Sequence, residues 1–217
     1  MKIYLFDFDG TLVDSMPTYS GIMRQILEDN NIEYTNKLMK IITPLGFKGS
    51  AKYFINVLGV DSTEEDLIQL MNEKAIYEYS YNILAKHNVI EVLEKLKKNG
   101  AQLNILTASP HITLDPCLKR LGIYDLFTNI WSCEDFATTK DDPDIYIKAS
   151  EKIGVGVEEV IFLDDNYNAL LTAKRAGMQV CGVYDKSSDE YVDEIEAIAD
   201  RYIYDFTELL MFFEIGK

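Results

Sequence analysis

Residues 1–15, MKIYLFDFDGTLVDS, decide the expected fold. The run from Ile3 to Phe8 is apolar and β-prone, and Gly10 follows it, so it predicts a buried strand. Asp7 and Asp9 stand at the end of this strand, although carboxylates are rarely buried without a partner. The stretch therefore predicts a core strand with a chemical site at its carboxyl end.

Apolar runs alternate with helical patterns in the second part of the chain. Strands are expected at 103–106, 129–132, 160–163, 179–183 and 202–204, with a helix after each of the first three and after the last. This alternation predicts an α/β fold, a doubly wound, Rossmann-like parallel sheet with helices on both faces.

Residues 17–82 differ, because they show helical patterns without a convincing strand. They include a helix opened by Pro17, two short helices broken at Pro44, and a helix capped by Ser62 with Glu65. We therefore expect a helical cap domain at 16–83, inserted into a core domain made of 1–15 and 84–217.

Charge and composition exclude several classes of partner. The 217 residues carry a net charge of −15, which argues against nucleic acid and against anionic membrane surfaces. No apolar run approaches the roughly 20 residues of a membrane span. The three cysteines are far apart and odd in number, so reduced thiols in a cytoplasm are expected. The pattern leaves the oligomeric state open.

Polar groups follow two further strands of the predicted sheet. Thr107, Ala108 and Ser109 follow one strand, and Asp164 and Asp165 follow another. Carboxyl ends of parallel strands meet at one edge, so these groups should converge with Asp7 and Asp9. Four carboxylates repel one another unless a cation joins them, and Mg²⁺ prefers oxygen ligands and commonly bridges to phosphate. The sequence thus predicts a Mg²⁺ site and a small phosphorylated substrate.

These motifs resemble those of the haloacid dehalogenase-like (HAD) hydrolase superfamily. DFDGTLVDS is similar to its first motif, LTAS to its second, Lys140 with PDIY to its third, and IFLDDN with AKRAGM to its fourth. The four occur in the expected order along essentially the whole chain, and the helical insert stands where that family has its helical cap.

The resemblance implies a role for each residue. Asp7 would be the nucleophile that forms a phosphoaspartate, and Asp9 the general acid and then the base. Thr107 and Lys140 would complete the catalytic set. The implied metal ligands are Asp7, Asp9 through its carbonyl, Asp164 and Asp165. Gly10, Thr11, Ala108 and Ser109 would contact the substrate. Lys48 is expected to contact it for another reason, as a cation of the helical insert that would meet an anionic substrate. Dehalogenating members lack the second acid, so Asp9 favours phosphoryl chemistry.

The expected function is a Mg²⁺-dependent phosphatase acting on a small phosphorylated metabolite. One alternative is a sugar phosphomutase, because FKGSAK resembles the cap loop of β-phosphoglucomutases. A second alternative is a non-catalytic protein that binds phosphometabolites. Sugar phosphate, phosphoglycolate, nucleotide and pyrophosphate all stay open as substrates.

Overall fold

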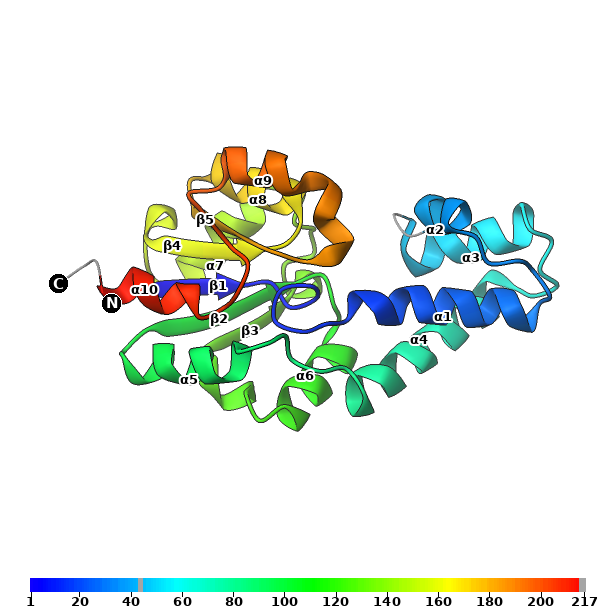
Figure 1. Ribbon diagram of the computed structural model, residues 1–217, viewed down its shortest axis with the longest axis horizontal. Helices are drawn as coiled ribbons and strands as arrows, with labels where there is room; N and C mark the ends of the chain where they lie inside the picture. Colours follow the sequence, from blue (N-terminus) through cyan, green and yellow to red (C-terminus); the bar gives the residue numbers. More distant parts are fainter. Residues whose placement is uncertain (43–44, 215–217) are drawn as a thin grey trace. The chain divides into compact units, whose positions relative to one another are not determined.

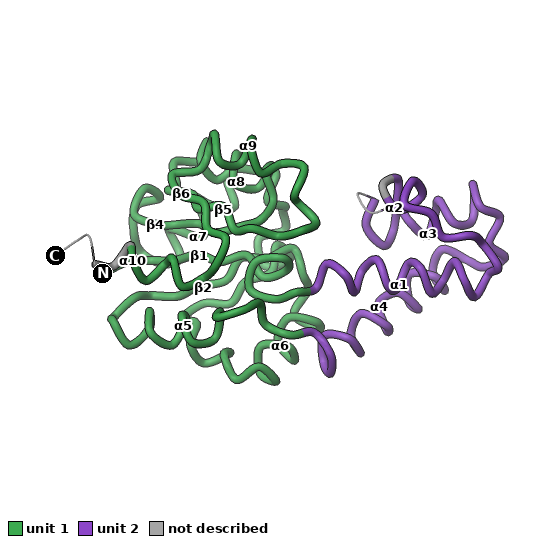
Figure 2. The backbone as a smooth tube through the Cα atoms, in the orientation of Figure 1, with its two compact units in different colours: residues 1–14, 84–217 green, residues 15–83 purple. Residues whose placement is uncertain are grey.

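The computed structural model describes residues 1–42 and 45–214, and it divides into two compact units (Figure 2). Unit 1 consists of Met1–Asp14 and Leu84–Lys217, and unit 2 of Ser15–Ile83. Within the described ranges, no helix combines the length and apolar character needed to cross a membrane.

Unit 1 contains a six-stranded sheet in which all neighbouring strands are parallel, in the order β3-β2-β1-β4-β5-β6 (Figure 1). The strands are β1 Ile3–Phe6, β2 Gln102–Thr107, β3 Asn129–Ser132, β4 Val160–Asp164, β5 Gln179–Val183 and β6 Arg201–Ile203. From β1 the chain first forms β2 and β3 on one side, and then crosses to form β4, β5 and β6 on the other side. The predicted doubly wound sheet is thus confirmed, and its switch point, where such folds bind ligands, lies at the ends of β1, β2 and β4.

The side chains of β1 are buried on both faces of this sheet. Ile3 and Leu5 belong to a core that includes residues of α7 (Asp144–Ile153) and α8 (Tyr167–Ala176). Phe6 points the other way and packs against Phe127 and Phe206. Because successive side chains of a strand point to opposite faces, the apolar run buries both faces of the strand.

The helices of unit 1 alternate with its strands. They are α5 Val89–Lys98, α6 His111–Arg120, α7 Asp144–Ile153, α8 Tyr167–Ala176, α9 Val192–Ile198 and α10 Glu208–Glu214. Short 3₁₀ helices are η2 Tyr124–Leu126, η3 Cys133–Phe136, η4 Val157–Glu159 and η5 Lys186–Tyr191.

Unit 2 is built from α1 Met16–Asp29, α2 Asn36–Ile42, α3 Gly46–Asn56 and α4 Glu64–Tyr81. It has its own apolar core, in which Met23, Leu27 and Phe54 are fully buried. α2 and α3 are two separate short helices, as expected, but Pro44 itself lies outside the described residues.

One predicted helix cap is wrong by one residue. The N-cap of α4 is Thr63, not Ser62, and the hydroxyl of Thr63 accepts a hydrogen bond from the amide of Asp66 at 3.1 Å. Thr63 has the extended backbone that an N-cap requires (φ −91°, ψ 157°), so its side chain can reach the free amides of the first turn.

Candidate active site at the carboxyl ends of β1, β2 and β4

Three buried carboxylates gather beyond the ends of β1 and β4. Asp7, Asp164 and Asp165 are exposed by only 5%, 1% and 7%. One oxygen from each lies within 4.8 Å of the others. The register explains this, because Phe6 pairs with Leu163 and the amide of Asp7 donates to the Leu163 carbonyl at 2.8 Å. Parallel pairing thus brings the acids that follow both strands to one place.

Lys140 is the cation of this acidic cluster. Its ammonium donates to Asp7 and, at 2.9 Å, to Asp164. The loop that carries Lys140 is held by Tyr146, whose hydroxyl lies 3.1 Å from the Lys140 carbonyl and 3.1 Å from that of Ala169. The lysine expected from the third motif therefore lies against the expected nucleophile.

Asp165 is fixed by contacts on both of its oxygens. The Thr11 hydroxyl donates to one oxygen at 3.2 Å, and the Ser188 hydroxyl donates to the other at 2.9 Å. Gly10 packs against the same carboxylate, since a Cβ on Gly10 would lie 2.7 Å from its nearest oxygen. Thr11, a predicted substrate contact, is fully buried and bonded to Asp165 in this structure.

Asp9 lies apart from this acidic cluster and contacts the end of β2. Its carboxylate accepts a hydrogen bond from the hydroxyl of Ser109. The amide of Ser109 in turn donates to the Thr107 hydroxyl at 3.1 Å, and Thr107 is buried. The two acids of the first motif therefore have different surroundings, Asp7 beside Lys140 and Asp9 beside the second motif.

The electrostatics of the cluster are those of crowded, buried acids. Burial raises the pKa of Asp7 well above its usual range, and Asp164, Asp165 and Asp9 add to the effect, while Lys140 opposes it. Burial, together with Asp164, raises the pKa of Asp165 to about 7. Burial works against the charge of Lys140, but Asp164 and Asp7 outweigh it and raise the pKa of Lys140.

This donor set fits a hard divalent cation. Three buried carboxylates with one lysine leave an excess of negative charge, and oxygen is the ligand that Mg²⁺ prefers. A bound cation would relieve the repulsion that raises the pKa values of Asp7 and Asp165. Asp7, Asp164 and Asp165 are therefore the residues that would hold the metal.

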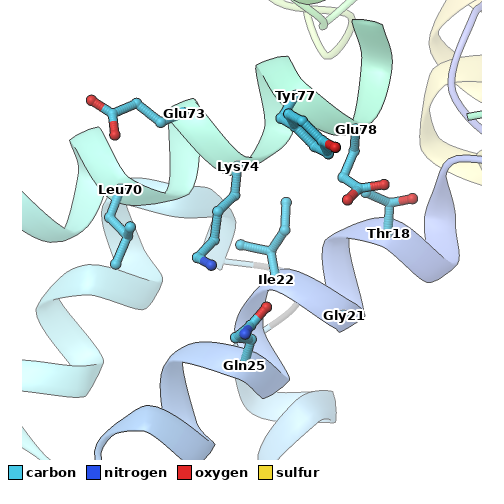
Figure 3. Close-up of a pocket in the computed structure, with 9 residues that line it drawn as sticks. All are labelled: Thr18, Gly21, Ile22, Gln25, Leu70, Glu73, Lys74, Tyr77 and Glu78. Atoms are coloured by element: carbon cyan, nitrogen blue, oxygen red, sulfur yellow. The ribbon is translucent and has the colours of Figure 1, made fainter. Parts of the chain in front are cut away.

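Unit 2 contains a groove of its own between α1 and α4, with a volume of about 640 Å³ (Figure 3). Gly21 helps to open it, because a Cβ at this position would meet no atom within 4 Å. Its lining residues are Thr18, Gly21, Ile22, Gln25, Leu70, Glu73, Lys74, Tyr77 and Glu78. None of the predicted site residues lines this groove. Lys48 is exposed on α3, and its role stays a prediction.

Sequence reasoning missed Ser188, which holds Asp165 from η5. Ser188 follows β5, a strand whose carboxyl end lies beside that of β4. The carboxyl end of β5 thus belongs to the same edge of the sheet, but Ser188 lies several residues beyond the strand, where no motif in the sequence marks it.

Fold and site together define the class of protein, an α/β protein with a cluster of buried aspartates at the switch edge of its parallel sheet. The chain belongs to the haloacid dehalogenase-like hydrolase family, whose model matches residues 4–183.

Curated relatives are named as phosphatases. A phosphoglycolate phosphatase of Colwellia psychrerythraea is 28% identical over 97% of this chain and 96% of its own length. A phosphorylated carbohydrates phosphatase of Thermotoga maritima is 25% identical over 87% of this chain and 88% of its own. The family thus makes this chain a hydrolase, and these relatives of it are named for the cleavage of phosphate esters.

The fold also matches a solved structure along its full length. A Thermotoga maritima protein provisionally assigned as a beta-phosphoglucomutase superposes with a TM-score of 0.83 and covers 100% of both chains. At 24% identity, this match supports the fold and carries no argument for mutase activity.

Proposed function

We propose that this hydrolase is a Mg²⁺-dependent phosphatase that cleaves a small phosphomonoester through a phosphoaspartate on Asp7. The observation that carries the proposal is the contact of Lys140 with Asp7 inside the buried acidic cluster, with Asp9 held separately by Ser109. These two separate environments support a role for Asp7 as the nucleophile and for Asp9 in proton transfer.

Asp7 and Asp9 carry the chemical steps of this reaction. A carboxylate oxygen of Asp7 attacks phosphorus, the bond from phosphorus to the ester oxygen breaks, and the carboxyl of Asp9 donates a proton to the leaving alcohol. Asp9 then takes a proton from water, whose oxygen attacks the phosphoaspartate. The bond from phosphorus to Asp7 breaks, and inorganic phosphate leaves. Such proton transfer typically contributes about 10²–10⁴-fold to the rate.

The surrounding residues stabilise charge and orientation. Lys140 compensates for the negative charge of Asp7 and of the transferred phosphoryl group. Thr107, with the amides of Ala108 and Ser109, binds phosphate oxygens beside Asp9. A Mg²⁺ ion held by Asp7, Asp164 and Asp165 would neutralise the charge that develops on the phosphoryl oxygens.

Two phosphate-bearing classes of substrate follow from the relatives, phosphorylated carbohydrates and phosphoglycolate. The first experiment is a screen of these esters, with nucleotides and pyrophosphate, for released phosphate in the presence of Mg²⁺. A phosphatase releases phosphate from at least one small ester. A mutase instead forms an isomer of one sugar phosphate and responds to a sugar bisphosphate.

A trapping experiment tests the nucleophile. Acid quenching with a ³²P-labelled ester should leave label on the parent protein but not on the Asp7→Asn protein, because the amide cannot attack phosphorus. The exposed Asp125→Asn substitution serves as a matched control and should keep the label. Labelling of the Asp7→Asn protein at the parent level would refute the assignment. A parent protein that binds phosphate esters but transforms none would indicate a non-catalytic binding protein.

A further inference from the structure

Lys86 is a mostly buried lysine that lies outside the acidic cluster. Its side chain is exposed by 19%, and its ammonium donates to the Gly10 carbonyl at 2.6 Å and to the Tyr184 carbonyl. It also donates to the Asp185 carboxylate at 3.1 Å, and the Asp185 side chain is 8% exposed. An ammonium has three hydrogens, so these three acceptors account for all of its donors.

The acceptors of Lys86 belong to two turns, and each turn holds one oxygen of Asp165. On one side, Gly10 is followed by Thr11, which donates to Asp165. On the other side, Asp185 begins the turn that ends in Ser188, whose amide donates to the Asp185 carbonyl at 3.1 Å and whose hydroxyl donates to Asp165.

Lys86 is itself fixed by a short backbone ribbon within unit 1. Its amide donates to the Leu12 carbonyl at 3.0 Å, and the amide of Asp14 donates to the Leu84 carbonyl at 3.0 Å. Val13 and Ala85 form an antiparallel bridge between these two contacts. The ammonium is therefore anchored through its own backbone and connects two turns that are far apart in sequence.

We propose that Lys86 is a positioning residue for the metal site, because it joins the two turns that hold Asp165. The inference rests on the proposed function, in which Asp165 is a ligand of Mg²⁺. Mg²⁺ requires near-ideal octahedral geometry, so a carboxylate whose two supports move apart binds it less well. Removing a residue that orients a metal ligand typically lowers metal affinity about 10–100-fold.

The test is Mg²⁺ binding by the full chain without substrate, measured by isothermal titration calorimetry. Lys86→Met keeps much of the length of the side chain but cannot donate, and should raise the Mg²⁺ dissociation constant by about 10–100-fold. Lys186→Met removes the same charge from an exposed position next to Asp185 and should leave the constant unchanged. Lys86→Arg keeps a charged donor and should recover part of the affinity.

A kinetic measurement separates positioning from general structural damage. In the Lys86→Met protein, the Mg²⁺ concentration for half-maximal activity should rise, while the KM for the ester at saturating Mg²⁺ should stay at the parent value. Parent-like Mg²⁺ affinity in a folded Lys86→Met protein would overturn the inference and leave the proposed function standing. A parent protein that binds no Mg²⁺ would overturn both.

If the Lys86→Met protein fails to fold, Asp185→Asn provides the second test. It neutralises the charged partner of Lys86 and keeps the shape of the side chain. It should weaken Mg²⁺ binding several-fold, and unchanged binding would overturn the inference.

Discussion

Substitution of Gly10 by alanine should damage the site in a way that the structure allows us to calculate. Gly10 has φ +74°, a conformation that residues with a Cβ adopt only at a cost, and its missing side chain leaves space for Asp165. In Gly10→Ala, the new Cβ would lie 2.7 Å from one oxygen of Asp165 and 2.8 Å from the other.

Two separate contributions set the expected loss of stability. The backbone strain of a non-glycine residue at this φ costs about 1–3 kcal/mol. In addition, Asp165 must move by roughly 0.7 Å to reach ordinary van der Waals contact with the Cβ. That movement weakens its hydrogen bonds from Thr11 and Ser188, and bonds to charged groups contribute about 1.5–3 kcal/mol each.

Gly100 supplies the matched control for this prediction. It has φ +83°, and a Cβ placed on it would meet no atom within 4 Å. Gly100→Ala should therefore show the backbone strain alone, about 1–3 kcal/mol. Gly10→Ala should show this loss plus about 1–3 kcal/mol from the displaced carboxylate.

Urea denaturation gives the free energies of unfolding, and calorimetric titration gives the Mg²⁺ affinity. Gly10→Ala should lower that affinity about 10–100-fold, because Asp165 no longer has the geometry that the metal requires. Gly100→Ala should bind Mg²⁺ like the parent. If the two proteins lose the same stability and keep the same Mg²⁺ affinity, the close packing of Gly10 on Asp165 has no functional role.

Three further predictions concern charge and capping. Without Mg²⁺, the free energy of unfolding measured by calorimetry should rise as the pH falls from about 7 to 5. The carboxyl of Asp165 has a pKa of about 7 in the folded state and near 3.9 in the unfolded state, so over this range only the folded state binds its proton, which contributes at most about 1.4 kcal/mol per pH unit. Excess Mg²⁺ should flatten this pH profile. The raised pKa of His111 acts in the same direction, so the scan belongs in a His111→Gln background, and a profile that falls over this range would contradict the reasoning. Lys140→Met removes the cation from the buried carboxylates, so without Mg²⁺ it should lower the free energy of unfolding in urea by about 3–5 kcal/mol. With Mg²⁺ the loss should be smaller. An equal loss in both conditions would argue against Lys140 and Mg²⁺ binding the same carboxylates. Thr63→Ala should destabilise unit 2 by about 1 kcal/mol in the same assay, whereas Ser62→Ala should leave its stability unchanged. A larger loss for Ser62→Ala than for Thr63→Ala would mean that Ser62 is the N-cap of α4.

The caps of α4 show where sequence reasoning reaches its limit for the fold. Ser62 and Thr63 are adjacent hydroxyl residues, and each has an acid three positions later, Glu65 and Asp66. Both pairs fit the looser pattern of a hydroxyl residue followed three positions later by an acid. Only the backbone conformation decides between them, and it is Thr63 that has the extended backbone of an N-cap. Similarly, α9 has seven residues with Ile195 as its one buried residue, which is too short and too polar for periodicity to reveal it.

The strands could be predicted because their signal is local and strong. The run from Ile3 to Phe6 is fully apolar, and the expected strands at 129–132 and 179–183 coincide with β3 and β5. From such strands, the rule that parallel strands end at one edge brings their terminal acids together without knowledge of any side-chain contact. The acidic cluster was therefore accessible from sequence.

The supports of Asp165 were not accessible in this way. Lys86 is separated by 76 residues from Gly10 and by 99 from Asp185, and no periodic pattern links these positions. A lysine after a short loop looks like a solvated surface residue until the fold brings acceptors to it.

The surroundings of Lys140 show the same limit for electrostatics. Asp141 and Asp142 follow it directly, and counted as charges they would lower the positive potential beside Asp7. In the structure, Asp142 accepts hydrogen bonds from the amide of Asp144 at 3.0 Å and from the Thr138 hydroxyl at 2.9 Å, and these bonds, the one from Asp144 first, lower its pKa. Its carboxylate thus serves the start of α7, while the ammonium of Lys140 lies between Asp7 and Asp164. Side chains that are adjacent in sequence can point in different directions, which separates their charges. The net charge of a short stretch of sequence therefore does not give the electrostatic field at the site.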